Sequence, residues 1–227
     1  MASEATLLAL DTSTDRGSVA LARAGEGGRL EALAAHDYDA EPGHAERLLP
    51  AIDALFRGTG LGLGGLSAIA VGVGPGSFSG LRVGVTTAKA LGFAGGVRVV
   101  GVSGLAALAA ASGAGAGLVV ALLDARRDEA FAAAYRAGDW LEPAEPPRLL
   151  SLDEARRWVG SLPGPRTLVG SGAPLVDPAA AAGPAHPPAL AIAALAAALL
   201  ARGGDPLPTE PLYVRPPNAT PPRPARA

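Results

Sequence analysis

The chain of 227 residues carries a formal net charge of −2 and contains no cysteine, and 49% of its residues are hydrophobic but only 4% aromatic. Without cysteine, disulfides, thiolate nucleophiles and cysteine-ligated zinc are excluded. The slightly negative charge argues against direct binding of nucleic acid, because proteins that neutralise phosphates by themselves usually carry a clear positive excess.

The first half of the chain predicts a three-stranded meander followed by alternating helices and strands. Strands are predicted where short apolar or alternating runs lie between turn residues, at 6–10, 18–23, 29–37, 66–73 and 97–102. The glycine-rich turn 25–28 joins the second strand to the third. Apolar spacing predicts a helix over 44–56, closed by Gly58 and Gly60, and a helix to about residue 94 capped by Ser77 or Ser79. The order β-β-β-α-β-α-β mixes an antiparallel unit with parallel crossovers.

The second half repeats the opening of the first after a glycine-rich segment. Two strands, 118–123 and 129–135, flank a charged turn, and a helix, a strand and an Ala/Leu helix are predicted at 152–159, 167–169 and 189–201. Arg202, Gly203 and Gly204 end the last helix, and the proline-rich tail 206–227 is expected to be extended or disordered. We infer a weak internal repeat of two lobes, with a boundary near 102–117.

Neither export nor membrane insertion is predicted. The N-terminus has an acid before a short apolar run, whereas a signal peptide needs a basic start and a longer apolar stretch. The uncharged segment 99–123 is long enough to span a bilayer, but glycines at 113, 115 and 117 break the helix that spanning would require. We therefore expect a cytoplasmic protein.

Two polar segments are candidates for a nucleotide site. The turn after the first strand and the glycine-rich loop 72–80 each admit two interpretations, an anion site or a tight turn. The loop matches neither the dinucleotide fingerprint nor the P-loop. Asp11 and Asp124 follow the first strand of each half, where two carboxylates could hold a metal-bound nucleotide. Ser13 and Arg126 stand where such a design needs glycine, so we expect at most a degenerate site, comprising Asp11, Thr12, Ser13, Thr14, Gly74, Gly76, Ser77 and Asp124.

A stripe of small residues at intervals of four lies on the second predicted helix. Glycine inside a helix costs about 1 kcal/mol against alanine, so a compensating contact is expected. We interpret the stripe as a surface for close approach of another helix, either 44–56 of this chain or a helix of another subunit. The predicted partner interface comprises Leu48, Leu49, Ile52, Phe56, Gly80, Gly84, Ala88 and Gly92.

The three histidines lack metal-ligand spacing. No His-Glu-x-x-His segment is present, and no histidine pair lies four residues apart on a predicted helix. Accordingly, no metal site is predicted at His36, His44 and His186.

Five segments carry a resemblance to a known family: 8–14, 44–50, 74–84, 124–127 and 211–215. The chain resembles the bacterial TsaB (YeaZ) family over roughly residues 6–216. The resemblance implies an α/β fold of two duplicated lobes of the actin-like, sugar kinase and Hsp70 type (ASKHA, RNase H-like). The lobes would be 1–102 and 103–216, followed by a tail 217–227. Whether the helix 189–201 packs back on the first lobe is left open.

The same resemblance implies a function without catalysis by this chain. Such proteins are non-catalytic subunits of the complex that attaches threonylcarbamoyl to adenosine 37 of tRNAs reading ANN codons. The implied partners are the catalytic TsaD subunit, the TsaE ATPase, a second copy when alone, and tRNA only through the complex. No resident cofactor is expected, with ATP or ADP and Mg²⁺ entering only in the assembled complex. An ATP-binding kinase or ATPase remains the alternative, and a glycoprotease-like peptidase is less favoured.

Overall fold

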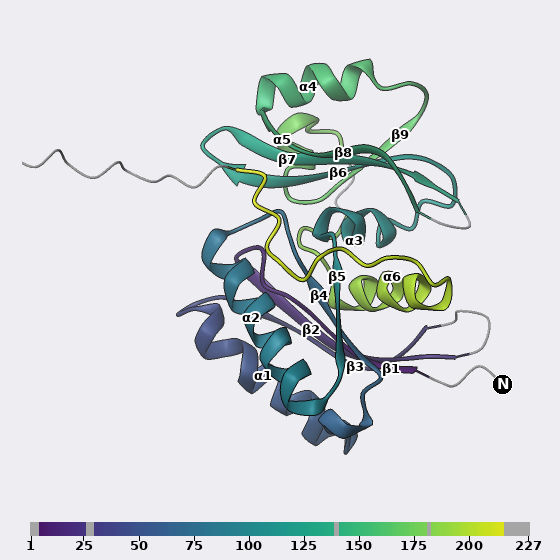
Figure 1. Ribbon diagram of the computed structural model, residues 1–227. Helices are drawn as coiled ribbons and strands as arrows, with labels where there is room; N and C mark the ends of the chain where they lie inside the picture. The colour runs from purple at the N-terminus through teal and green to yellow at the C-terminus, as the bar shows by residue number, and fades with distance from the viewer. Residues whose placement is uncertain (1–4, 26–29, 139–140, 181–182, 216–227) are drawn as a thin grey trace, which may run out of the picture.

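Two β-sheets stacked between helical layers make up the two lobes of the chain (Figure 1). The computed structural model describes residues 5–25, 30–138, 141–180 and 183–215. The expected glycine-rich turn at 25–28 and the tail from 216 onward therefore lie largely outside the described residues.

The N-lobe sheet has the order β3-β2-β1-β4-β5. β1 pairs antiparallel with β2 and β2 with β3, whereas β4 is parallel to β1 and β5 is parallel to β4. This confirms the predicted meander with parallel crossovers. The strand bounds are Ala5–Asp11 (β1), Arg16–Ala24 (β2), Leu30–Asp39 (β3), Ala68–Gly72 (β4) and Arg98–Val102 (β5).

The C-lobe sheet repeats this topology with one strand fewer, in the order β8-β7-β6-β9. β6, β7 and β8 form an antiparallel meander, and β9 is parallel to β6 as β4 is to β1. The duplicated α/β fold is therefore as expected. The bounds are Gly117–Arg126 (β6), Glu129–Ala137 (β7), Glu142–Ser151 (β8) and Arg166–Val169 (β9).

Successive side chains of β1 point to opposite faces of the N-lobe sheet, and each face packs against different helices. Leu8 and Leu10 pack with α1 and α2, while Leu7 and Ala9 pack with α6 on the opposite face. Figure 1 shows these layers below and above the N-lobe sheet. The helix 189–201, whose packing the sequence left open, thus lies on the N-lobe. The helices are His44–Thr59 (α1), Phe78–Gly95 (α2), Gly104–Ala110 (α3), Leu152–Ser161 (α4), Ala173–Val176 (α5) and Ala189–Ala201 (α6), with a 3₁₀ turn, η2, at Leu63–Gly65.

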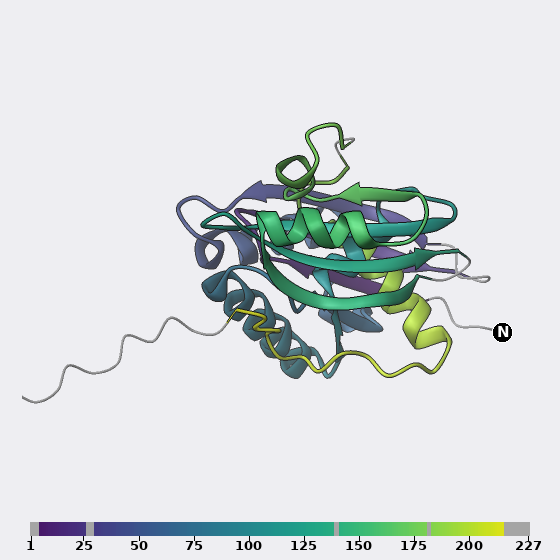
Figure 2. The ribbon, with the colours of Figure 1, turned by 90° about the horizontal axis from the view of Figure 1, so that it is seen from above.

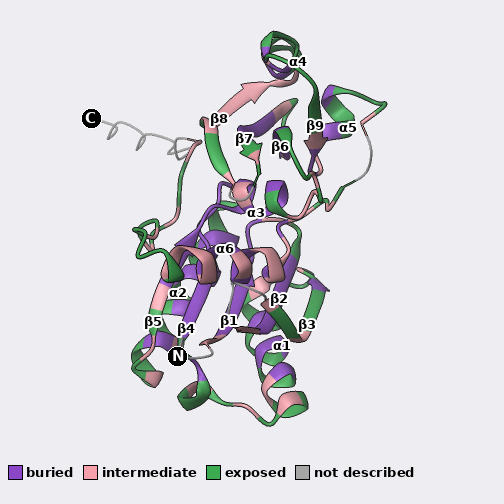
Figure 3. Cartoon of the chain, turned by 90° about the vertical axis from the view of Figure 1, so that its right-hand side faces the viewer, coloured by how far each residue is buried: buried purple, intermediate pink, exposed green. Residues whose placement is uncertain are grey.

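Helix α3 lies between the two sheets and was not predicted. Leu105 and Leu108 pack against the C-lobe sheet, and Ala107 packs against α6. The Ser103 hydroxyl caps the helix by accepting a hydrogen bond from the backbone N–H of Ala106 at 3.3 Å. α4 and α5 cover the other face of the C-lobe sheet, and α4 lies across the C-lobe strands in Figure 2. Figure 3 shows that buried residues concentrate on the strands and on the helix faces that touch them.

Helix α1 runs past the predicted end at residue 56, whereas α2 is capped by one of the two serines predicted. α1 continues through Gly58 to Thr59, and Gly60, at a φ of 69°, closes it in the left-handed conformation that glycine favours. At the start of α2 the cap is Ser77, whose hydroxyl accepts from the backbone N–H of Gly80, while Ser79 lies in the first turn. Strand β8 was not predicted, and it accommodates its prolines because it lies at the edge of the sheet.

The glycine stripe of α2 faces the chain's own sheet, which corrects the expectation that another helix packs on it. A Cβ at Gly80 would lie 2.0 Å from the Thr12 carbonyl oxygen, and one at Gly84 would lie 2.3 Å from Thr12 Oγ1. A Cβ at Gly92 would lie 2.5 Å from a methyl group of Val99. The missing side chains let α2 lie close to β1 and to the segment around β5.

Six of the eight predicted interface residues are buried in the N-lobe itself. They are Leu48, Ile52, Gly80, Gly84, Ala88 and Gly92. Leu49 is 53% exposed, and Phe56 is partly exposed. Of the predicted interface residues, Leu49 and Phe56 are thus the ones left accessible on the outward side of α1.

Candidate functional site

A cleft of about 900 Å³ opens between the two lobes. Its N-lobe wall consists of the turn after β1 and the start of α2, and its C-lobe wall includes the β6–β7 turn. Of the eight residues predicted for a nucleotide, the cleft is lined by Ser13, Thr14, Gly76, Ser77 and Asp124. Asp11, Thr12 and Gly74 are buried outside its lining.

The turn after β1 is fixed by hydrogen bonds within the N-lobe. Asp11 Oδ1 accepts from the backbone N–H of Ser13 at 2.9 Å and from its hydroxyl at 2.7 Å. Thr12 Oγ1 donates to the Gly80 carbonyl at 2.7 Å, and His44 Nε2 lies 2.7 Å from the Thr14 carbonyl. Of the two interpretations of this segment, a hairpin turn held by its own side chains describes it fully.

The glycine-rich loop 72–80 packs directly on that turn. A Cβ at Gly72 would lie 1.9 Å from Asp11 Oδ2, and one at Gly76 would lie 2.3 Å from the Ser13 carbonyl oxygen. The backbone N–H of Ser77 donates to that same carbonyl at 2.7 Å. The glycines therefore serve close approach between two loops, and the Ser77 N–H is already engaged within the protein.

Asp11 is a buried carboxylic acid rather than an exposed ligand. It is 1% exposed, and Oδ2 has no hydrogen-bond partner among the described residues. Burial raises the pKa of Asp11 despite the opposing effect of the Ser13 hydrogen bonds and of His186 and His44. The neutral form of this carboxyl is accordingly favoured relative to an exposed aspartate.

Asp124 forms the same turn in the second half. Its Oδ1 accepts from the backbone N–H of Arg126 at 2.8 Å, as Asp11 Oδ1 accepts from the residue two positions on. Arg126 adopts a φ of 61°, and its guanidinium pairs with Asp15 of the N-lobe and lies 3.7 Å from Asp124 Oδ2. The arginine thus extends across the cleft between the paired turns.

These residues do not fit a magnesium-bound nucleotide held between Asp11 and Asp124. Mg²⁺ requires accessible oxygen ligands in octahedral geometry. One oxygen of Asp11 is occupied by Ser13, and the other is enclosed beside Gly72 and Gly104. The Asp124 carboxylate faces the positive charge of Arg126. The two turns therefore do not present a matched pair of accessible carboxylates to a cation.

Several residues that line the cleft were not among the predicted site residues, although some of them lie in segments that the sequence analysis singled out. Phe78 begins α2, His186 belongs to a proline-rich loop and lies 3.1 Å from Asp37 Oδ2, and Tyr213 to Arg215 belong to the tail. The available signal was that Phe78, Arg126 and residues 213–215 fall in the family-like segments 74–84, 124–127 and 211–215. The cleft-lining residues outside the prediction are Asp15, Arg16, Phe78, Leu123, Ala125, Arg126, Phe131, Ser171, Ala185, His186, Tyr213, Val214 and Arg215.

The histidines have structural neighbours. His44 begins α1 and lies against the turn after β1, with Nδ1 3.4 Å from the Tyr38 hydroxyl. Among the described residues, no three His, Asp or Glu side chains are placed to hold a metal ion. Nor is any helix in the described ranges long and apolar enough to cross a membrane.

Comparison with known proteins points in one direction. Residues 38–158 match the family model described as TsaD, tRNA N6-adenosine threonylcarbamoyltransferase. The TsaB protein of Haemophilus influenzae, described as a tRNA threonylcarbamoyladenosine biosynthesis protein, is 44% identical over 128 residues. That match covers 56% of this chain and 52% of the relative, so the chain aligns to about half the relative's length.

Two solved structures match nearly the whole chain. YeaZ from Pseudomonas aeruginosa has a TM-score of 0.74 and 32% identity, covering 92% of this chain and 99% of that protein. A Pseudomonas aeruginosa protein described as similar to the peptidase YeaZ has a TM-score of 0.76 and 32% identity, covering 93% and 100%.

Proposed function

Because the chain belongs to the TsaB (YeaZ) family of TsaD-like proteins, we propose that it acts in the biosynthesis of threonylcarbamoyladenosine in tRNA as a non-catalytic subunit. Its role is to bind and activate the catalytic TsaD subunit in the cytoplasm. TsaE joins the same assembly, tRNA is met through the complex, and the chain pairs with a second copy when alone.

The geometry of the paired turns supports a non-catalytic role. The two aspartates that would hold a metal-bound nucleotide have other surroundings here. Asp11 is buried, and Asp124 lies beside the Arg126 guanidinium. The Arg126 guanidinium spans the cleft and occupies the space that a phosphate would need. These features favour a subunit that acts through its surface over the kinase or ATPase alternative.

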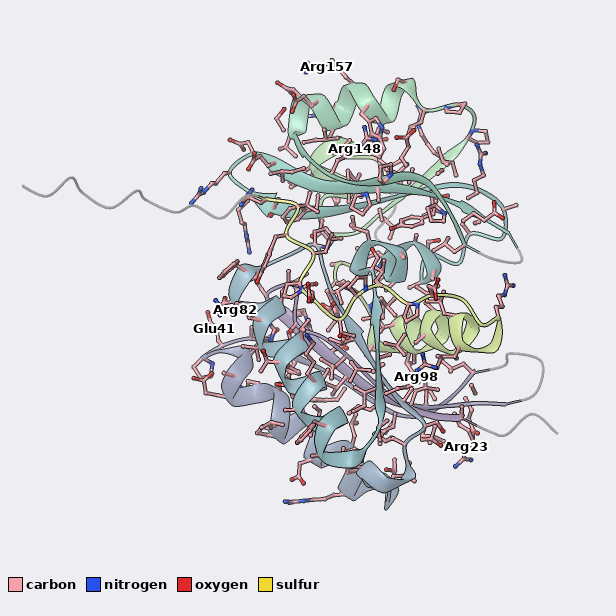
Figure 4. The ribbon with its side chains drawn as sticks, in the orientation of Figure 1. Arg23, Glu41, Arg82, Arg98, Arg148 and Arg157 are labelled. Carbon is pink, nitrogen blue, oxygen red and sulfur yellow. The ribbon has the colours of Figure 1, made fainter. Side chains whose placement is uncertain are left out.

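The observation that carries the partner role is the apolar outward surface of α1 and α2. Leu49 on α1 is 53% exposed, and Phe93 on α2 is 93% exposed. The two helices lie side by side on the outer face of the N-lobe (Figure 1), and Arg82 projects from α2 in Figure 4. Exposed aromatic and aliphatic side chains and an arginine on two neighbouring helices are the composition expected of a protein–protein contact. A helical partner surface on TsaD is the proposed occupant.

Replacement of Leu49 by glutamate tests this proposal. Leu49→Glu should weaken association with purified TsaD at least about tenfold, roughly 1.4 kcal/mol, because a charge would be desolvated in the contact. Association is measured by analytical ultracentrifugation, and tRNA modification by the reconstituted system. Because Leu49 is half exposed, the melting temperature should stay near that of the unchanged chain.

Leu175 provides a matched control. It is 39% exposed on α5 of the C-lobe, so Leu175→Glu introduces the same charge away from α1 and α2. It should leave both association and modification unchanged. Equal affinity of the Leu49→Glu and unchanged chains for TsaD would remove α1 from the contact.

A further inference from the structure

The described end of the chain crosses from one lobe to the other. After α6, residues 205–215 run along the N-lobe and reach the C-lobe hairpin, drawn in yellow in Figures 1 and 2. We name residues 207–215 the strap. The sequence predicted an extended or disordered tail, and the strap is extended but attached at several points.

The first attachment is to the edge strand of the N-lobe. Leu207 forms an antiparallel bridge with Gly101 of β5. A Cβ at position 101 would lie 2.6 Å from the Leu207 carbonyl oxygen and 2.9 Å from that of Pro208, so only glycine allows this approach. Farther along, the backbone N–H of Leu212 donates to the Val73 carbonyl at 2.7 Å. The strap is thus bonded to the backbone that follows β4.

The second attachment is to the first turn of α2. The Tyr213 ring stacks on Phe78 with centroids 4.9 Å apart and an angle of 26° between the planes. The Arg82 guanidinium lies 5.3 Å from the centre of the Phe78 ring. Aromatic pairs and arginine–ring contacts of this geometry are attractive beyond the apolar area they bury.

The third attachment is to the C-lobe. Val214 packs against the core between α3 and the C-lobe sheet. The Arg215 guanidinium donates to the Ala125 carbonyl at 2.9 Å, pairs with Glu129 and lies 5.8 Å from the centre of the Phe131 ring. Three successive residues therefore contact both lobes.

The strap also forms a wall of the cleft, which Tyr213, Val214 and Arg215 all line. Prolines 206, 208 and 211 restrict the backbone of the segment, which lowers the entropy lost when it is held against both lobes. From these contacts we propose that the strap is an interlobe latch that sets the separation of the two lobes and the opening of the cleft. The Arg126–Asp15 pair and α3 are further links between the lobes, so removing the latch loosens their arrangement without unfolding either core.

Spin-label distances between the lobes test the latch. The chain has no cysteine, so Ala35→Cys on β3 and Arg157→Cys on α4 would be its only labelled positions. Both residues are exposed, and Arg157 projects from the outer side of α4 in Figure 4. Adding Tyr213→Ala and Arg215→Ala to this full-length chain should broaden the distance distribution and shift it to longer values. An unchanged distribution in a folded chain would overturn the proposal.

Three matched variants separate the latch from a general effect of mutation. Tyr213→Phe keeps the ring and should keep the original distribution, as should Glu210→Ala at an exposed strap position. Ending the chain at Arg215 should likewise have no effect. A shift in any of these three as large as that of the double variant would show that the Tyr213 and Arg215 contacts are not the latch.

Hydrogen exchange of the unsubstituted chain supplies a test that does not depend on a variant's folding. The latch requires the amide of Leu212 to exchange at least about tenfold more slowly than in an unstructured peptide, because it is bonded to Val73. Exchange at the unstructured rate would show that the strap is not held, and the proposal would fail.

Discussion

Asp11 illustrates how burial determines the chemistry of a residue that the sequence marks as a ligand. Asp11 and Asp124 form the same turn in the two halves, each accepting a backbone N–H two residues on. The Asp11 carboxyl is buried, with Gly72 of the glycine-rich loop against its Oδ2, whereas the Asp124 side chain lines the cleft. Because Asp11 is buried, its neutral acid form is favoured, whereas the Asp124 side chain lies beside the Arg126 guanidinium.

The pH dependence of stability should reveal this difference. Because the pKa of Asp11 is raised in the fold, the folded chain binds this proton more tightly than the unfolded chain. Its contribution to stability is full below the ordinary pKa of 3.8 and is lost as the pH rises through the raised value. The melting temperature of the unchanged chain relative to Asp11→Asn should therefore increase as the pH falls from 7 toward 4.

Asparagine is the appropriate comparison because it imitates the neutral acid and keeps an acceptor for Ser13. At pH 7, Asp11→Asn should melt at or above the temperature of the unchanged chain. A difference in melting temperature that does not vary with pH would mean that Asp11 titrates normally.

At the scale of elements, the stripe on α2 shows that glycines at intervals of four can let a helix lie close to a sheet as well as to another helix. Small residues every four positions form one face of a helix, but the spacing does not identify what that face touches. Here the partner is Thr12 and the segment around β5. The contacts that offset the free-energy cost of glycine in α2 therefore lie within the N-lobe.

Gly84→Leu should destabilise the fold directly. Its Cβ alone would meet Thr12 Oγ1, whose hydrogen bond to the Gly80 carbonyl is buried. Overpacking of this kind costs roughly 1–3 kcal/mol, which lowers the melting temperature of a chain this size by about 3 to 10 °C. Thermal melts test this, with Thr86→Leu on the exposed side of α2 as control. Equal melting temperatures for the two leucine variants would contradict the packing described.

Helix α4 begins with a capping box that the sequence pattern contains locally. The Ser151 hydroxyl accepts from the backbone N–H of Glu154, and the Glu154 carboxylate accepts from the backbone N–H of Ser151. The hydrogen bonds from Ser151 lower the pKa of Glu154 from its ordinary 4.5. The stabilisation this carboxylate provides is present above that value and is lost as the pH falls.

Ser151→Ala should remove the cap. We expect a loss of about 1 kcal/mol in the free energy of unfolding, measured by denaturant titration. The pKa of Glu154, followed by NMR, should rise toward 4.5 because its hydrogen bond from the Ser151 hydroxyl is gone. An unchanged Glu154 pKa would show that the hydroxyl does not hold this carboxylate.

At the scale of the whole molecule, duplication has produced two lobes whose cleft is bridged by the chain. Arg126, the loop containing His186 and the strap each connect residues of the N-lobe with later segments. The cleft that related folds would offer to a ligand is here partly built from these bridges.

Titration of the isolated chain with ATP and Mg²⁺ should give no binding tighter than about 1 mM, equivalent to about 4.1 kcal/mol. The reason is that Asp11 is enclosed in the N-lobe and the Asp124 carboxylate faces the Arg126 guanidinium. Arg126→Gly removes the bridging side chain and should not create magnesium-dependent binding, because Asp11 stays enclosed. Micromolar binding with turnover by the unchanged chain would favour the kinase or ATPase alternative.

Local patterns were sufficient to predict most elements of this chain. Apolar and alternating runs between turn residues identified β1, β2, β6 and β7, and an Ala/Leu run ended by Arg202, Gly203 and Gly204 identified the bounds of α6. The repeated opening of the two halves indicated the paired aspartates, and the family resemblance indicated the duplicated fold. These features depend on residues that are close in sequence.

The tertiary structure alone decided α3, β8, the strap and the cleft. A seven-residue helix is too short to be stable by itself, so α3 depends on packing between the two sheets. β8 depends on pairing with β7 despite its prolines, and the strap on Gly101 and Phe78. The cleft assembles segments separated by up to two hundred residues. Their chemistry follows from neighbours that are remote in sequence, because burial, charge pairing and close backbone approach are set by the packed fold.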